Sequence, residues 1–151
     1  MQPHSPQQRG FSLVELLIVI TCIGIIAAIA IPYMMQAKQA AHGASAVSSL
    51  RVIYSSQASY RTASGVYGDL ATLGNANYIA DPSLRAGLKG DYNFAITLGD
   101  PALGGDARIY YRANATPASS PARWLHYMID ASGVMRFEQG APATINSSPM
   151  D

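Results

Sequence analysis

Charged and metal-ligating side chains are few in this sequence. Its 151 residues include ten Lys and Arg, nine Asp and Glu, and three His. Removing residues 1–10 takes away Arg9 and no acid, which leaves nine bases against nine acids and no basic face for nucleic acid. The histidines, His4, His42 and His126, form no H-x-x-x-H or H-E-x-x-H pair, which argues against a zinc site. We therefore predict no metal, no cofactor and no nucleic-acid partner, and we find no catalytic constellation.

Cysteine occurs once, as Cys22, and it lies inside the longest apolar run, so no disulfide framework holds the rest of the chain. That run is residues 11–31, FSLVELLIVITCIGIIAAIAI, and Pro32 marks its end. At about 1.5 Å per residue, a helix of this length spans about 30 Å, the thickness of a bilayer's hydrocarbon core. The run is longer than the apolar core of an ordinary signal peptide. We therefore predict a membrane-spanning helix.

Glu15 is the only acid in this apolar run. A carboxylate in a spanning helix costs roughly 2.5–3.5 kcal/mol on insertion scales, so it is expected to have a partner or a function. The alternative is that Glu15 lies near the helix end and extends to the membrane interface.

The residues around Glu15 form a recognisable pattern. A short polar leader ends in Arg9-Gly10, Phe11 follows directly, and Glu15 lies four residues further on. This arrangement resembles the prepilin processing motif of the type IV pilins and the type II secretion pseudopilins. The resemblance implies cleavage between Gly10 and Phe11, and methylation of Phe11 by the same membrane peptidase. Many type IV pilins close a C-terminal loop with a disulfide, and this chain departs from that pattern.

The resemblance also implies partners and a location. Glu15 is expected to pair with the Phe11 amine of a neighbouring copy in a helical filament. Other partners are the prepilin peptidase, the inner-membrane assembly machinery and, before assembly, membrane lipid. Arg9 favours a cytoplasmic leader, so we expect a single-pass precursor in the bacterial inner membrane with its C-terminus outside. The assembled chain would lie in a cell-surface or periplasmic filament.

Gly24 and Pro32 interrupt the helical pattern, because proline removes a backbone hydrogen bond and kinks a helix. One interpretation is a kink at the membrane boundary. The other is a segment that loses helix on assembly, as the resemblance implies for this pair of positions.

Residues 33–62 are predicted to continue the helix as an amphipathic segment that packs under a sheet. Ser49 and Ser56 are among the serines that we place mostly away from the apolar face. The residues expected on that face or at its border are Ala40, Ala44, Val47, Leu50, Ile53, Tyr54, Gln57 and Tyr60.

The remaining residues, 63–151, are predicted to form a globular head. Leu70 and Leu73 suggest a helical turn, and Asp81 before Pro82 suggests a capped helix over residues 82–89. Alternation and turn residues predict strands over residues 92–98, 108–113, 124–129 and 134–137, a loop over 114–122, and a loose tail over 139–151. The predicted fold class is α+β: a long N-terminal helix, transmembrane in its first half, packed on a small antiparallel sheet of three to four strands. The predicted domains are 1–10 (cleaved leader), 11–32 (transmembrane and assembly segment), 33–62 (amphipathic continuation) and 63–151 (head).

Several functions are compatible with this layout. We predict a structural subunit of a type IV pilus-like filament and no enzymatic activity; the alternative is a pseudopilin of a type II secretion system. Major pseudopilins have an acidic calcium loop near the C-terminus, whereas only Glu138 and Asp151 are acids beyond Asp130 here. A DNA-uptake pilin would prefer a basic patch, for which Arg85 and Lys89 offer one pair. A membrane-anchored enzyme or sensor would require the catalytic constellation that we do not find.

Overall fold

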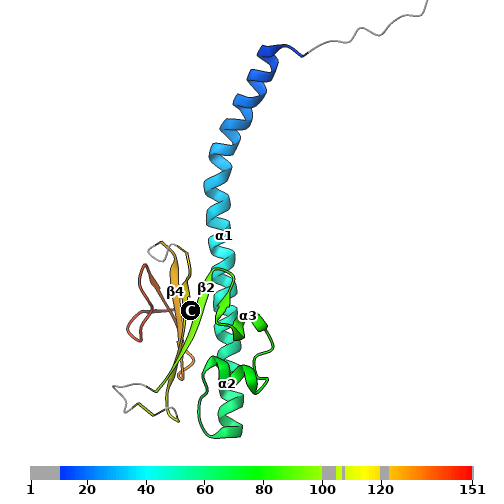
Figure 1. Ribbon diagram of the computed structural model, residues 1–151. Coiled ribbons are helices and arrows are strands. Elements are labelled where there is room, and N and C mark those ends of the chain that lie inside the picture. The colour runs from blue at the N-terminus through cyan, green and yellow to red at the C-terminus, as the bar shows by residue number, and fades with distance from the viewer. Residues whose placement is uncertain (1–10, 100–104, 107, 120–122, 151) are drawn as a thin grey trace, which may run out of the picture. The chain divides into compact units, whose positions relative to one another are not determined.

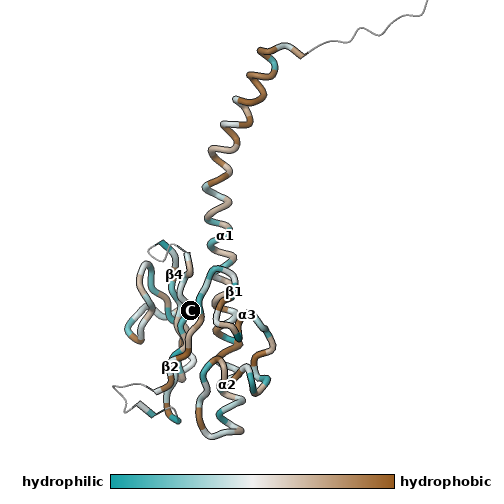
Figure 2. The backbone as a smooth tube through the Cα atoms, viewed as in Figure 1, coloured by the Kyte–Doolittle hydropathy of each residue, from teal (hydrophilic) through white to brown (hydrophobic). Residues whose placement is uncertain are grey.

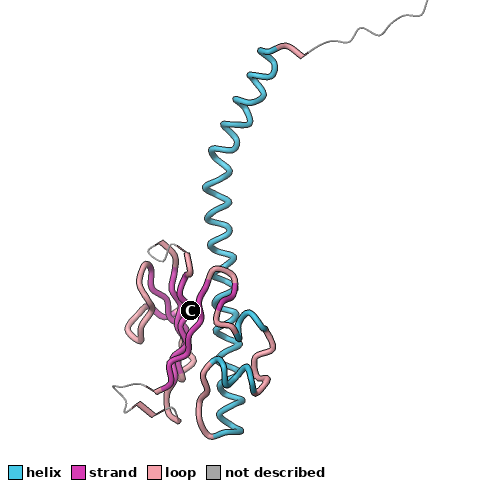
Figure 3. Tube along the Cα trace, viewed as in Figure 1, coloured by secondary structure: helices cyan, strands magenta, loops and turns pink. Residues whose placement is uncertain are grey.

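The computed structural model describes residues 11–99, 105–106, 108–119 and 123–150. The predicted leader 1–10, with Arg9 and Gly10, lies outside the described residues. The described residues form three helices and a sheet, whose course Figures 1 and 3 show. The elements in chain order are α1 (Leu13–Ser64), α2 (Leu70–Asn75), α3 (Pro82–Arg85), β1 (Leu88–Lys89), β2 (Tyr92–Leu98), β3 (Tyr111–Pro117), β4 (Leu125–Asp130), β5 (Met135–Gln139) and β6 (Ser148–Pro149).

The chain forms two units, residues 1–38 and 39–151. In the described part of the first unit, nearly every side chain is exposed, and Figure 2 shows the first turns of α1 as mostly hydrophobic. By length and composition α1 is able to cross a membrane, and no residue in its most apolar window is buried. Single apolar side chains on a surface are ordinary, but a continuous apolar surface marks a site covered by lipid or by protein.

The second unit holds the sheet, whose strands follow one another in the order β1-β2-β3-β4-β5-β6. Every neighbouring pair is antiparallel; the register aligns Phe94 with Ala115, Ala115 with Tyr127, and Tyr127 with Phe137. The α+β fold is therefore confirmed, with six strands in place of three to four. The additional strands, β1 and β6, have two residues each and lie at the sheet edges, so they are too short to show alternation in the sequence.

The core of the second unit lies between the sheet and the C-terminal half of α1 (Figure 1). Leu50 and Ile53 of α1 are fully buried in the same cluster as Tyr127 and Ile129 of β4. Gly43 permits close packing at one end, because a Cβ there would lie 2.7 Å from the Tyr127 hydroxyl. The full buried set of the cluster is Ala46, Leu50, Ile53, Tyr67, Leu73, Ile79, Leu84, Tyr92, Phe94, Tyr111, Ala113, Ala115, Tyr127, Ile129 and Met135.

The buried face of α1 differs from the predicted one. Leu50 and Gln57 are buried as expected, but Tyr54 is 38% exposed. Ser49 and Ser56, which we placed away from the face, are buried. Their hydroxyls donate to backbone carbonyls, Ser49 to Ser45 (2.9 Å) and Ser56 to Tyr78 (2.9 Å). A hydroxyl that is hydrogen-bonded to the backbone loses little free energy on burial, so these serines are tolerated in the core. A hydropathy pattern does not include these hydrogen bonds and therefore places serine on the exposed face.

Ala40 and Ala44, which were expected to continue this face upstream, are exposed in the single chain. The helix also extends to Ser64, slightly beyond the predicted end at residue 62.

The predicted loop over residues 114–122 is wrong in its first part, because β3 continues to Pro117. Tyr111, Ala113, Ala115 and Pro117 alternate with less buried residues along this strand. Its start also moves from residue 108 to Tyr111. Asn, Ala and Pro are poor strand formers locally, but here strands pair on both sides and supply hydrogen bonds that no local pattern contains.

The helix predicted over residues 82–89 ends at Arg85. Gly87 has a φ of +77°, a left-handed conformation that stops the helix, and Leu88–Lys89 then form β1. Asp81 caps the helix as predicted: its Oδ1 accepts the backbone N–H groups of Ser83 (2.9 Å) and Leu84 (3.3 Å).

The tail predicted to be loose is ordered through most of its length. The fifth strand continues to Gln139, and β6 pairs with it through Arg136–Pro149 and Phe137–Ser148. The Arg136 guanidinium donates to the Ser147 carbonyl (3.0 Å), so side chains as well as strand pairing hold this segment.

Candidate processing and assembly site

The segment expected to be processed lies at the start of α1. Phe11 and Ser12 precede the helix without regular structure, and the backbone N–H of Leu16 donates to the Ser12 carbonyl (3.2 Å) in the first turn. Phe11 is 82% exposed. Gly10 lies outside the described residues, so the structure leaves the predicted cleavage bond untested. Phe11 itself lies in accessible chain before the helix begins.

Glu15 lies in the first turn of α1 and is exposed. Negative charge is favourable there, because the first backbone N–H groups of a helix point toward it. Four positions of the chain separate Glu15 from Phe11, which itself precedes the helix, so a new Phe11 amine could pair with a carboxylate of the same chain or of a neighbour. The pairing partner of Glu15 stays a prediction.

The polar side chain of Thr21 shows how other polar groups are accommodated in this segment. Its hydroxyl donates to the backbone carbonyls of Leu17 and Ile18, both at 2.8 Å. Thr21 is thus satisfied by its own helix, whereas no hydrogen bond within the described residues engages the carboxylate of Glu15. Glu15, the only acid between residues 11 and 31, therefore has no hydrogen-bond partner among the described residues.

Gly24 and Pro32 are both helical in the single chain, since α1 runs continuously from Leu13 to Ser64. A Cβ on Gly24 would meet nothing within 4 Å, so the chain's own packing does not require glycine there. Loss of helix at these positions on assembly stays a prediction.

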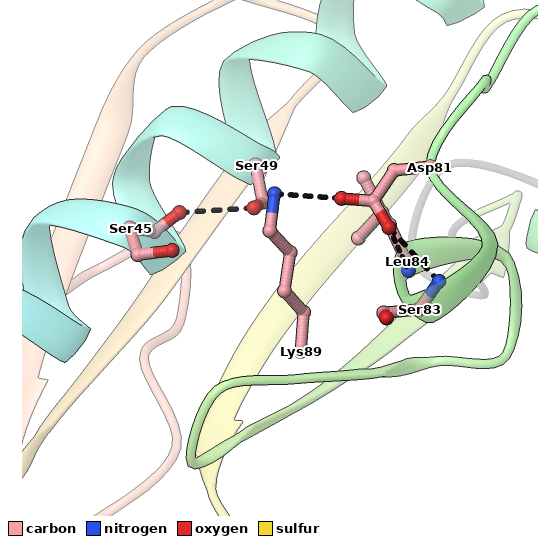
Figure 4. Close-up of polar contacts among 6 residues, drawn as sticks. All are labelled: Ser45, Ser49, Asp81, Ser83, Leu84 and Lys89. Carbon is pink, nitrogen blue, oxygen red and sulfur yellow. Dashed lines mark hydrogen bonds and ion pairs between the residues drawn. The ribbon is translucent and has the colours of Figure 1, made fainter.

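The head offers little free positive charge at the pair considered for DNA. The Lys89 ammonium lies 2.9 Å from the Asp81 carboxylate (Figure 4). This hydrogen bond, with those from the α3 backbone, holds the pKa of Asp81 below its ordinary value. Arg85 donates to the Ile79 carbonyl and to the Asn77 side chain. Both cations therefore join α3 to its neighbours, and neither projects as part of a basic patch.

Sequence reasoning missed one feature of the head, a pocket between α1 and the sheet that contains three tyrosines. Its residues lie far apart in the sequence, so no motif could have revealed it. Among the described residues, no group of three His, Cys, Asp or Glu side chains is placed to hold a metal ion.

Comparisons with known proteins agree with the N-terminal pattern. Residues 5–31 match the family model of the prokaryotic N-terminal methylation motif. The chain is 39% identical over 67 residues to a protein described as "Type IV major pilin protein PilA" from Myxococcus xanthus (strain DK1622). That alignment covers 44% of this chain and 30% of the relative, so the chain spans about a third of the relative's length. No solved structure matches the chain. The motif and the relative both support the resemblance of this chain to prepilins of the type IV pilin family.

Proposed function

We propose that this chain is a structural subunit of a type IV pilus-like filament and has no catalytic role. It would be assembled from the bacterial inner membrane after cleavage between Gly10 and Phe11 and methylation of Phe11. The observation that carries the proposal is the apolar surface of α1 in the first unit, which is exposed on all sides and has one carboxylate. Lipid covers such a surface in the precursor, and the helices of other copies would cover it in a filament.

The type II secretion pseudopilin is the second candidate, because the same motif and helix serve both classes. The relative is described as a major pilin, which favours the pilus. Deleting the gene and complementing it would separate the two. A pilus subunit predicts that surface filaments disappear in electron micrographs while the set of secreted proteins is unchanged; loss of secreted proteins without loss of surface filaments would favour the pseudopilin.

Glu15 gives the sharpest test of assembly. A charge that is alone in an apolar filament core is costly, and pairing with the Phe11 amine of a neighbour offsets that cost. Such a pair would also align each new subunit at one axial step. We expect Glu15→Val to insert into the membrane and to be cleaved normally, because the substitution removes a polar group from the spanning helix, but to form few or no filaments.

Two variants complete this experiment. Glu15→Gln keeps a polar side chain without the charge, so it should also reduce filaments if the charge is what matters. Thr21→Val removes a polar group that is bonded to its own helix, and it should leave filaments at the wild-type level. Wild-type amounts of filament from Glu15→Val cells would show that the pairing proposal is wrong.

A further inference from the structure

The second unit contains a pocket of about 450 Å³ beside the C-terminal part of α1. Tyr54, Arg61 and Thr62 of α1 line it, together with Tyr67, Tyr111 of β3 and Ala131. Pockets that hold small molecules have volumes of roughly 300–1,000 Å³, apolar or aromatic walls and a few convergent polar groups. This pocket has all three features, and none of its residues belongs to the membrane segment or to the processing motif.

Arg61 supplies positive charge at the pocket. Its Nη1 donates to the Tyr67 hydroxyl at 2.8 Å, and its guanidinium carbon lies 4.9 Å from the centre of the Tyr67 ring. The stacked ring and the hydrogen bond fix the plane of the guanidinium. The other N–H groups of Arg61 have no protein acceptor among the described residues. Because the Tyr67 hydroxyl accepts from Arg61, its own proton remains available to a ligand.

Tyr111 supplies a buried donor that lacks a partner. The residue is 1% exposed, and its hydroxyl makes no hydrogen bond within the described residues. Burial raises the pKa of Tyr111, and the neighbouring Tyr67, Tyr54 and Asp130 raise it further, so the hydroxyl stays protonated. A buried hydroxyl without a partner is destabilising, and its presence beside a cavity points to a group from outside the chain.

One acid lies close to these donors, and its charge is partly compensated. Asp130 does not line the pocket, and its Oδ1 accepts both the backbone N–H and the hydroxyl of Ser132. The residues that line the pocket carry a guanidinium and four hydroxyls, those of Tyr54, Thr62, Tyr67 and Tyr111.

We propose that this tyrosine pocket binds a small organic anion through a carboxylate group. The planar fork of Arg61 matches a carboxylate, and the Tyr111 and Tyr67 hydroxyls donate to the same oxygens. The tyrosine rings give apolar walls on which a flat organic body packs, which favours an aromatic acid over an inorganic anion. This binding site is independent of filament assembly, so it can be tested on the single chain.

The test uses the full chain in detergent micelles, with sodium benzoate as the probe and benzamide as its uncharged counterpart. Binding is followed by the NMR shifts of the Thr62 and Ala131 backbone amides, which report on the pocket itself and not on uptake by the micelle. We expect saturable shifts with benzoate. Benzamide should bind at least about tenfold more weakly, because it cannot form the ion pair with Arg61. Inorganic phosphate, which lacks a ring, should also bind more weakly than benzoate.

Substitutions assign the roles. Arg61→Gln should weaken benzoate binding about tenfold, and Tyr111→Phe about three- to tenfold, since each removes one donor. Tyr111→Phe keeps the ring, so its melting temperature should equal or exceed that of the wild type. Arg51→Gln changes an exposed arginine of the same helix outside the pocket and should leave binding unchanged.

Several results would overturn the proposal. They are an absence of saturable shifts, equal binding of benzoate and benzamide, equal binding of phosphate, or full binding by both Arg61→Gln and Tyr111→Phe. Self-association that depends on Arg61, in a chain that binds no benzoate, would overturn it in favour of an acidic side chain from a second copy.

Discussion

The stability of the second unit is expected to depend on Leu50. This side chain is fully buried and belongs to the cluster that joins α1 to the sheet. Leu50→Ala removes three carbons, and at about 0.8 kcal/mol per buried carbon the lost transfer energy is about 2.4 kcal/mol. The cavity that remains raises the expected loss toward the upper part of the range of about 2–5 kcal/mol. A domain of this size has a total stability of about 5–15 kcal/mol, so the change should be large.

Val52 provides the matched control on the same helix. It is 42% exposed, so Val52→Ala removes little buried area, and the better helix propensity of alanine offsets part of that loss. We expect this variant to lie within about 0.5 kcal/mol of the wild type.

Urea unfolding of a fragment comprising residues 39–151 would measure both variants. The fluorescence of Trp124 reports on the fold, because the indole lies 6.0 Å from the rings of His42 and Tyr92. With a slope of about 1–3 kcal/mol per molar urea, Leu50→Ala should lower the midpoint by roughly 1–3 M. Equal midpoints for Leu50→Ala and Val52→Ala would refute the packing of α1 under the sheet, and would indicate that this face of the helix contacts other subunits.

Three further predictions concern other parts of the chain. Gln57 is fully buried; its Nε2 donates to the Gly68 carbonyl (2.6 Å) and its Oε1 accepts the Gly68 N–H (3.0 Å). Gln57→Leu leaves the Gly68 carbonyl and N–H without these partners, so it should lower the free energy of unfolding by about 1–3 kcal/mol in the same urea assay. The pKa of Asp81 is lower in the folded state than in the unfolded state. The ionised carboxylate therefore stabilises the fold above its ordinary pKa of about 4, and this stabilisation is lost as the pH falls further. Asp81→Asn should reduce the loss of stability on the acid side, measured as the urea midpoint against pH. Gly10→Val should leave the leader attached, and the intact mass of the wild-type mature chain should correspond to a methylated Phe11; a mature chain that retains Met1 would contradict the processing site.

The elements with strong local signals could be predicted from the sequence. The boundaries of β2 (Tyr92–Leu98) follow from strict alternation, and the start of α3 follows from the Asp81-Pro82 pair, since cap and first-turn proline are local effects. Phe11 and Glu15 were singled out through a family resemblance, whose motif lies within a few adjacent positions. Their proposed roles remain predictions.

The features that depend on distant contacts could not be predicted. The strand β3 resembles a loop in its residue types, and only pairing with β2 and β4 makes it a strand. Ser56 is buried because a carbonyl 22 positions away accepts its hydroxyl. The tyrosine pocket combines α1 with Tyr67, Tyr111 and Ala131, so it exists only after the chain has folded.

The exposure of α1 also indicates where an independently folding part of this chain begins. Residues 16–37 contain no ionisable acid or base other than Cys22 and Tyr33, and Lys38 is the first charged residue after Glu15. Tyr33, Met34 and Met35 are 66–71% exposed, and the large apolar residues before them are exposed as well. The first buried residue of the helix is Gly43. A fragment that begins at Tyr33 would therefore expose three large apolar side chains that its own sheet does not cover. The first unit has no packed face to stabilise its helix in water, and isolated helices are marginal there, so this segment depends on lipid or on neighbouring helices to remain helical. The helix α1 thus has two apolar surfaces. After residue 39 its apolar stripe is covered by the sheet of the same chain, whereas before residue 39 the helix is exposed on all sides and needs other molecules to cover it.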